Sequence, residues 1–291
     1  MNKKYELLKD PIINLYRIRA LKDFSDIKAG TLGGYVENED NLSHDGNAWI
    51  YGNAKVYGNA WIYDNAKVYG DAKVYGNARV YDDAKVYGNA EVYGDAKVYG
   101  DARVYGDAKV YGDAEVCGNA RVYDDAKVCG DAIIYGDAII YGDARVCGNS
   151  WVYGDARVYG DAEVCGNARV YDDAKVCGNS WVYGDAIIYG DGRVCGNSWV
   201  YGNAEVYGNA EVCGNAFLKT NADYTVIHGF GSEERTTTFF RCKDGNIRVK
   251  CGCFYGTIDE FRYKVHETHS DSKYAKEYLM IADLMKFHFS E

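Results

Sequence analysis

The sequence has a single proline, Pro11, and it lies outside the long repeated segment that dominates the chain. Because proline cannot donate a backbone hydrogen bond, its absence there suits a structure in which every backbone N–H is paired. No apolar run approaches the length of a membrane-spanning helix, so we expect no transmembrane segment. The first ten residues, MNKKYELLKD, lack the apolar core of a signal peptide, which favours the cytoplasm of a bacterial host cell.

Histidine is scarce as well. The chain has five histidines, and none of them lies between Ile50 and Leu218. Histidine is the most frequent general base in enzymes, so the repeated segment offers no base of that kind. His44, just before the segment, is the one weak candidate for a catalytic residue near it.

What the repeated segment does contain is an aliphatic residue at every sixth position, twenty-nine times and without an insertion. Ala54 and Val56 alternate with Lys55, which is the pattern of a strand with one buried face. Gly58 and Asn59 then tolerate the left-handed backbone of a sharp corner. Three such strands would close a triangular coil of eighteen residues, with coils stacked at about 4.8 Å. The pattern predicts a parallel β-solenoid of nearly ten coils.

The composition changes on both sides of the repeats, and we predict three domains: a capping segment over 1–45, the solenoid over 46–218, and a small α+β domain over 219–291. In the capping segment, residues 14–19 alternate like a strand, and Leu32, one coil before Ile50, is expected to start an irregular first coil. In the last domain we expect strands over 224–230, 236–242 and 247–254, a helix from Thr257 toward His266, and a helix over 272–289.

The aliphatic residue at the first position and the small one at the fifth, as in Val56 and Ala60, resemble the hexapeptide-repeat proteins. This resemblance implies a left-handed parallel β-helix. The phrases ALKDF, KAG, GGYVE and NLS near the N-terminus are similar to enterobacterial hexapeptide proteins labelled acyltransferases, and to phage-encoded relatives. The phrases TTTFFR and DGNIRV near the C-terminus look like a domain found at the end of phage and prophage proteins. One departure is the tyrosine or cysteine that directly follows each aliphatic residue, where the family usually has glycine.

The charge of the repeats is acidic. Residues 50–218 carry 15 Lys and Arg against 24 Asp and Glu, and the whole chain has a net charge of −10. This balance makes direct nucleic-acid binding unlikely for the solenoid. Rows of corner aspartates could instead imitate the phosphates of a nucleic acid.

Outward aromatic side chains gather in the last repeats. Trp181, Trp199 and Phe217 are eighteen residues apart and should stack on successive coils, with Trp151 and Ile187 on a neighbouring face. Contiguous exposed apolar side chains mark contact surfaces. These five residues form the predicted binding site, which we expect to pack against the C-terminal domain, a second copy of the chain, or a host protein.

Ten cysteines are present, and seven of them replace tyrosine at one repeat position. We expect them to be free thiols, because a reducing compartment disfavours disulfides, although stacked neighbours are close enough to be bridged. A weaker candidate is a zinc site formed by Cys251, Cys253, His266 and His269, although the Cys-x-Cys spacing is shorter than in zinc fingers. No cofactor is otherwise expected.

Taken together, these features favour a non-catalytic binding or scaffold protein from a phage or prophage setting. A specific form of this hypothesis is an acidic inhibitor of a bacterial defence system. The alternative is a hexapeptide-repeat acyltransferase that uses an acyl-CoA donor, with His44 as its base. The missing histidines and the uninterrupted repeats argue against that alternative.

Overall fold

The computed structural model describes residues 3–290, which form two compact units, Met1–Gly160 and Asp161–Glu291. Short strands, three to a turn, make up the repeated part of both, and the twenty-nine strands of the two units correspond to about ten turns of eighteen residues. No helix within residues 3–290 has the length and apolar character needed to span a membrane.

The N-terminal unit begins with β1 (Tyr5–Lys9), β2 (Tyr16–Ala20), β3 (Leu32–Val36) and the short 3-10 helix η1 (Glu39–Asn41). Its repeats follow as β4 (Trp49–Ile50), β5 (Lys55–Val56), β6 (Trp61–Ile62), β7 (Lys67–Val68), β8 (Lys73–Val74), β9 (Arg79–Val80), β10 (Lys85–Val86), β11 (Glu91–Val92), β12 (Lys97–Val98), β13 (Arg103–Val104), β14 (Lys109–Val110), β15 (Glu115–Val116), β16 (Arg121–Val122), β17 (Lys127–Val128), β18 (Ile133–Ile134), β19 (Ile139–Tyr141), β20 (Arg145–Val146), β21 (Trp151–Val152) and β22 (Arg157–Tyr159).

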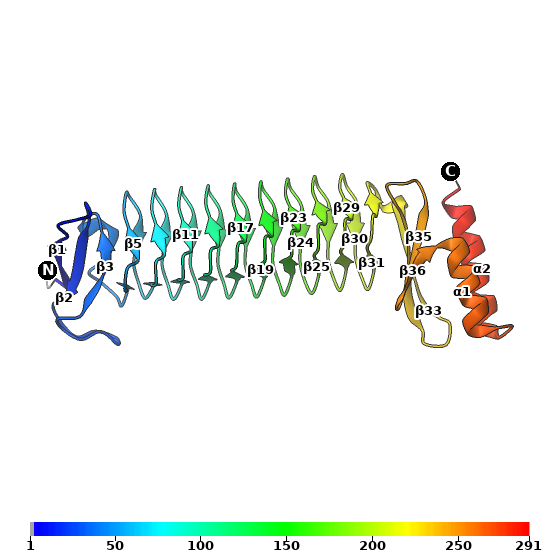
Figure 1. Cartoon of the computed structure of the whole chain (residues 1–291), viewed down its shortest axis with the longest axis horizontal. Coiled ribbons are helices and arrows are strands. Elements are labelled where there is room, and N and C mark those ends of the chain that lie inside the picture. The colour runs from blue at the N-terminus through cyan, green and yellow to red at the C-terminus, as the bar shows by residue number, and fades with distance from the viewer. Residues whose placement is uncertain (1–2, 291) are drawn as a thin grey trace. The chain divides into compact units, whose positions relative to one another are not determined.

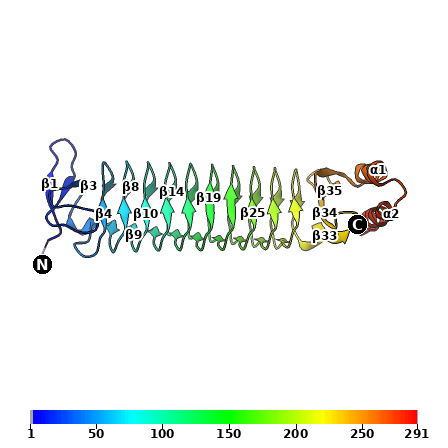
Figure 2. The same cartoon turned by 90° about the horizontal axis from the view of Figure 1, so that it is seen from below.

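Strands eighteen residues apart pair in parallel, so β5, β11 and β17 lie on the same side of this unit (Figure 1) and β4 and β10 on another (Figure 2). Lys55 is opposite Lys73, and Val56 is opposite Val74. The valines and alanines are fully buried, whereas the residue before each aliphatic position faces outward. The predicted solenoid with eighteen residues per coil is therefore confirmed.

The corners depend on a left-handed backbone. Gly88, for example, has φ +72° and lies against the backbone of Gly106 in the next coil. Four repeats have aspartate in this place, and these residues also adopt positive φ; Asp82 has φ +55°. The Asp82 carboxylate accepts a hydrogen bond from the backbone N–H of Gly100, one coil on, at 3.1 Å. Aspartate tolerates the left-handed region better than most residues, and this bond helps to hold it there.

The C-terminal unit continues the repeats with β23 (Glu163–Val164), β24 (Arg169–Val170), β25 (Lys175–Val176), β26 (Trp181–Val182), β27 (Ile187–Ile188), β28 (Arg193–Val194), β29 (Trp199–Val200), β30 (Glu205–Val206), β31 (Glu211–Val212) and β32 (Phe217–Leu218). After the 3-10 helix η2 (Asn221–Asp223) come β33 (Tyr224–Phe230), β34 (Arg235–Arg241), β35 (Ile247–Cys251), β36 (Phe254–Thr257), α1 (Ile258–His269) and α2 (Lys273–His288).

The last four strands form an antiparallel sheet in chain order, and α1 and α2 cover one face of it (Figure 2). Phe239 and Val249 of the sheet pack against Phe261, Tyr278 and Ile281 of the helices. The single return strand expected over 247–254 is wrong, because Gly252, at φ +56°, turns the chain and Cys251 pairs with Phe254 in a hairpin. Thr257 caps α1 through the expected capping box with Glu260.

The expected strand over 14–19 is present as β2, and β3 begins at Leu32 as an irregular first coil, but Leu32 is not in register with Ile50. β3 enters the first sheet with Val36 opposite Val56, a separation of twenty residues, and Leu32 is half exposed. The bend after Val36 contains η1, and this insertion makes the first coil longer than the eighteen residues of the others. Trp49 also departs from the outward pattern: it is fully buried, edge-on to Tyr5 and Phe24.

The direction of the backbone hydrogen bonds decides what each end of the stack must supply. In the hydrogen bonds between coils the N–H donates toward the C-terminal side, as Lys55 N does to Ala72 O at 2.9 Å. The first turn therefore presents carbonyl oxygens without a partner from a preceding coil. Lys4 Nζ donates to Ala48 O at 3.0 Å, and Asn41 Nδ2 donates to Gly58 O and Ala60 O at 2.9 Å.

The last turn of the C-terminal unit presents the opposite groups, N–H donors, and acceptors meet them there. Glu205 N donates to Asn221 Oδ1 at 2.7 Å, and Glu211 N donates to Thr238 Oγ1 at 3.0 Å. Buried backbone groups without partners are costly, so these side chains reduce that cost at the first and the last turn.

The corner geometry leads to a matched pair of substitutions. A Cβ at Gly88 would lie 3.0 Å from Gly106 N, whereas a Cβ at Gly52, which has φ +59°, would meet nothing closer than 3.5 Å. We expect Gly52→Ala to lower the free energy of unfolding by about 1 kcal/mol, from the left-handed backbone alone, and Gly88→Ala by roughly 2–3 kcal/mol. Urea denaturation of both variants measures the difference, and equal losses would contradict the close stacking of corners.

Candidate functional site

The outward aromatic column consists of Trp181, Trp199 and Phe217, on β26, β29 and β32. Trp181 and Trp199 are cross-strand partners, and their rings stack with centroids 5.2 Å apart and an interplanar angle of 7°. Phe217 continues the column at 6.2 Å with a tilted ring. Trp181 remains 39% exposed. The register of eighteen residues thus brings together three of the five predicted binding residues.

The aromatic column meets the C-terminal domain at Trp199. Lys243, in the turn between β34 and β35, places its ammonium nitrogen 3.8 Å from the centroid of the Trp199 ring. The backbone N–H of Lys243 donates to Asn215 O at 3.1 Å, which fixes the turn against the last coil. A cation over a tryptophan face is attracted by the ring electrons. Sequence reasoning missed Lys243, because nothing in a hairpin turn indicates which ring it will cover.

The other two predicted binding residues lie elsewhere. Ile187 belongs to β27, in a different sheet from the column, and pairs with Arg169 and Glu205. Trp151 belongs to the N-terminal unit, where it is 40% exposed and pairs with Ile133. Because Ile187 lies in a different sheet and Trp151 in the other unit, the place of these two residues in one binding site stays a prediction.

His44 is held inside the N-terminal cap. Its ring stacks on Tyr5 with centroids 4.3 Å apart, and its Nδ1 accepts a hydrogen bond from the backbone N–H of Lys4 at 3.2 Å. The neutral ring therefore carries its proton on Nε2, which lies 3.8 Å from Glu39 Oε1. Burial lowers the pKa of His44, although Glu39 opposes the shift. With its one lone pair already bonded, the ring has no nitrogen ready to accept a proton from a substrate.

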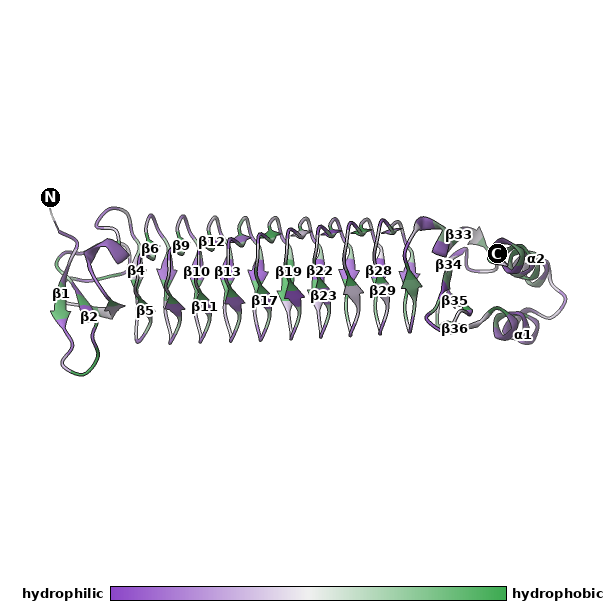
Figure 3. Ribbon diagram, turned by 90° about the horizontal axis from the view of Figure 1, so that it is seen from above, coloured by the Kyte–Doolittle hydropathy of each residue, from purple (hydrophilic) through white to green (hydrophobic). Residues whose placement is uncertain are grey.

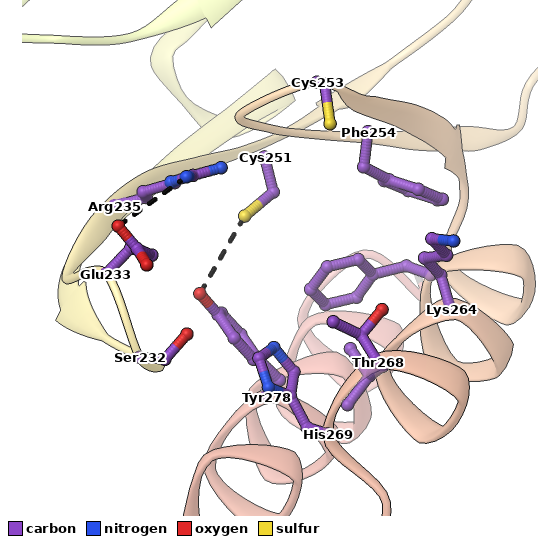
Figure 4. Close-up of a pocket in the computed structure, with 12 residues that line it drawn as sticks. Ser232, Glu233, Arg235, Cys251, Cys253, Phe254, Lys264, Thr268, His269 and Tyr278 are labelled. Carbon is purple, nitrogen blue, oxygen red and sulfur yellow. Dashed lines mark hydrogen bonds and ion pairs between the residues drawn. The ribbon is translucent and has the colours of Figure 1, made fainter.

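A cavity of about 430 Å³ opens in the C-terminal domain between the sheet and α1 (Figure 4). Its floor is apolar, with Phe254, Phe261 and Val265. Both cations at its edge are paired, Arg235 with Glu233 at 3.7 Å and Lys264 with Glu267 at 2.7 Å. The cavity can accept a small apolar group, and it offers no unpaired charge to orient a polar one.

The four candidate zinc ligands are only partly brought together. Cys251, Cys253 and His269 line this cavity, whereas His266 does not. The Cys251 thiol accepts a hydrogen bond from Thr237 Oγ1 at 3.2 Å and lies 4.0 Å from Tyr278 Oη. Among residues 3–290, no three His, Cys, Asp or Glu side chains are grouped so that they could hold a metal ion. The candidates therefore do not form a ligand set.

All ten cysteines are free thiols. In the C-terminal unit, Cys177, Cys195 and Cys213 follow the paired strands β25, β28 and β31, so they stack along one corner. A hydrogen bond from Cys195 lowers the pKa of the Cys213 thiol, and the nearby Lys250 ammonium lowers it further. Burial raises the pKa of Cys242, on the adjoining strand end, to about 11. Neighbouring thiols in this corner thus differ in reactivity.

Comparison with known proteins identifies the repeats. Residues 72–88, 96–112 and 138–154 match the YdcK beta solenoid repeat. A stretch of 37 residues, 13% of this chain, is 49% identical to "Uncharacterized acetyltransferase YdcK" of Escherichia coli (strain K12) and covers 11% of that protein. The chain spans about a tenth of the length of this relative. The chain is therefore a β-solenoid protein in which three stretches resemble the YdcK repeat and one short stretch is similar to a protein named an acetyltransferase.

The position of His44 predicts an acid-sensitive cap. The pKa of His44 is lower in the folded protein than the ordinary value of 6.5, which applies in the unfolded chain. As the pH falls toward 6.5, the unfolded chain therefore binds more protons than the folded protein does. The contribution of neutral His44 to the stability of the cap is therefore complete above pH 6.5 and declines on acidification. Hydrogen exchange of cap amides at about pH 7.5 and about pH 5.5 should show faster opening at the lower pH. His44→Gln should reduce this pH dependence, and an unchanged difference would exclude His44 as its source.

The thiol corner predicts selective alkylation. Since thiolates are the reactive form, iodoacetamide should modify Cys213 before Cys195 and Cys242 at neutral pH. Lys250→Met removes the nearby positive charge, so the pH at which Cys213 becomes half reactive should rise. Peptide mass spectrometry after brief labelling measures the order. Preferential modification of the more buried Cys242 would contradict the assignment.

Proposed function

We propose that this protein is a non-catalytic β-solenoid binding or scaffold protein, of phage or prophage origin, that recognises a host protein through the aromatic column. The observation that carries the proposal is the Trp181 ring, stacked on Trp199 and left 39% exposed. Tryptophan is the residue type most enriched among side chains that dominate binding energy. Its ring here is already fixed by stacking, so little side-chain entropy is lost when a partner covers it.

The surroundings of the column favour a protein partner. Lys243 covers Trp199 from one side, and Glu163 lies beside Trp181 on the preceding coil, so charged groups border an apolar centre. An apolar anchor within a polar rim is the usual composition of a protein–protein interface. Small molecules usually bind in concave pockets, whereas a column of rings on an open face offers a flat apolar surface. Such a surface suits a protein partner better than a small molecule.

Imitation of a nucleic acid has less support. On the N-terminal unit, a groove of about 550 Å³ is lined by Asp71, Asp107, Asp125 and Asp143, but also by Lys73, Lys109 and Lys127. Lys73 is paired with Glu91 at 3.0 Å. A phosphate backbone is uniformly negative, whereas this face alternates in sign. We therefore prefer recognition of a protein surface to imitation of phosphates.

Acyl transfer is the second candidate, and the short similarity to the acetyltransferase-named relative favours it. The bonded state of His44 Nδ1 speaks against it, because a general base needs a free lone pair within reach of the substrate. An acyltransferase would need another general base to deprotonate the acceptor that attacks the acyl group. The two candidates therefore differ in whether acetyl-CoA binds and whether His44 matters.

Capture from a bacterial host lysate tests the binding function. The full chain is immobilised beside Trp181→Ala and Trp61→Ala, and bound proteins are quantified by mass spectrometry. Trp61 is a matched control, since it faces outward with 42% exposure in the N-terminal unit. We expect the captured amount of one host protein to fall at least tenfold with Trp181→Ala and to stay unchanged with Trp61→Ala. Equal retention by both variants would contradict recognition through the column.

Calorimetric titration with acetyl-CoA separates the two functions. We expect no heat of acetyl-CoA binding with the wild type, and the same result with His44→Ala. Saturable binding that His44→Ala abolishes, together with acetyl transfer to an amine acceptor, would replace the proposed function with the enzymatic one. The unfolding transition of His44→Ala must stay cooperative for this comparison, because His44 packs on Tyr5.

A further inference from the structure

Helix α2 has apolar side chains on two opposite faces. One face, with Tyr278, Ile281 and Met285, is buried against the sheet and α1. The other carries Met280, Leu284 and Phe287, which are 72%, 57% and 78% exposed. These three positions are four and three residues apart, so they form one stripe along the helix. Figure 3 shows how much more hydrophobic α2 is than α1.

An ordinary surface helix has one apolar face, which packs on the core, so a second apolar stripe on the opposite face is in excess of what the fold needs. The three side chains expose on the order of 400 Å², since side chains of this size have roughly 200 Å² each to bury. That is as large as the biggest apolar patch of many monomers, and about half of the ~800 Å² that each partner contributes to a stable interface. Tyr263 of α1, 74% exposed, adds a further ring to the helical layer.

The charges around the stripe point to a partner without net charge. Residues 219–291 contain eleven Lys and Arg and eleven Asp and Glu. Three charged pairs beside the stripe are formed within the chain: Arg262 with Asp283, Lys286 with Asp259 at 3.3 Å, and Lys273 with Glu277 at 3.4 Å. Lys276, about one helical turn before Met280, is exposed and adds a single positive charge beside them. One lysine contributes too little to select an acidic peptide or an anionic membrane.

We propose that the stripe of Met280, Leu284 and Phe287 is a self-association surface on which a second copy of this chain docks. Two neutral C-terminal domains approach without net repulsion, whereas the repeats, with a net charge of −9 over residues 50–218, repel one another. This inference is independent of the proposed function, because it uses neither the aromatic column nor a host partner.

A two-fold axis fits the spacing of the stripe. In an antiparallel pair of α2 helices, an axis beside Leu284 brings Met280 of each copy opposite Phe287 of the other. The contact is then the same from both sides, as an isologous interface requires. Thioether and aromatic ring are favourable neighbours, and the two Leu284 side chains fill the centre between them. The stripe is thus complementary to itself.

Sedimentation velocity of the full chain across a range of micromolar concentrations tests the proposal. We expect the wild type to double in mass as concentration rises, and Leu284→Glu and Phe287→Glu to remain monomeric with unchanged melting temperatures, since both side chains are more than half exposed. Leu284→Met keeps an apolar group and should retain the dimer. Trp181→Ala should retain it as well, which separates this surface from the aromatic column.

Two results would overturn the proposal. One is a wild type that stays monomeric at every concentration. The other is a dimer that survives Leu284→Glu and Phe287→Glu together. Flotation with phosphatidylglycerol vesicles covers the alternative occupant: a monomeric wild type that floats, and loses flotation with Phe287→Glu, would assign the stripe to a lipid surface instead.

Discussion

The structure depends on the one-way ladder of backbone hydrogen bonds between neighbouring coils. In this ladder the N–H donates to a carbonyl one coil farther along the chain, as in Lys55 N to Ala72 O. This polarity makes the two ends chemically different, with carbonyl oxygens unpaired at the first turn and N–H groups unpaired at the last. Lys4 and Asn41 supply donors at the first, whereas Asn221 and Thr238 supply acceptors at the last. The flanking segments are therefore caps whose chemistry the ladder dictates.

The same constraint explains why His44 is an unsuitable catalytic residue and a suitable structural one. The cap must hold the Lys4 ammonium beneath the first coil, where burial lowers its pKa to about 8. His44 helps to hold that segment by accepting the Lys4 N–H and stacking on Tyr5, whose hydroxyl donates to Leu42 O at 2.7 Å. A ring used in this way keeps its position, and its lone pair is no longer available for chemistry.

Function in such a protein lies in what the coils carry outward. The interior consists of small aliphatic side chains and leaves no room for a ligand, so recognition depends on columns of side chains eighteen residues apart. The other columns consist largely of charged side chains, some of which pair with a neighbouring coil, as Lys97 does with Glu115 at 2.7 Å. The aromatic column and the apolar stripe of α2 differ, because each leaves large apolar groups in contact with water. We therefore propose them as two contact surfaces of different chemistry within the C-terminal unit.

The sequence by itself determined the coil, because a strict period of six fixes both the strand alternation and the register of eighteen. It therefore predicted that Trp181, Trp199 and Phe217 would stack. Register could not be read where the period ends, so Val36 rather than Leu32 pairs into the first sheet, and Trp49 is buried by a cap whose path no pattern indicated. Only the tertiary structure placed Lys243 over Trp199 and left one face of α2 without a partner. Those contacts join segments with no common repeat, and their geometry follows from how the caps and helices pack.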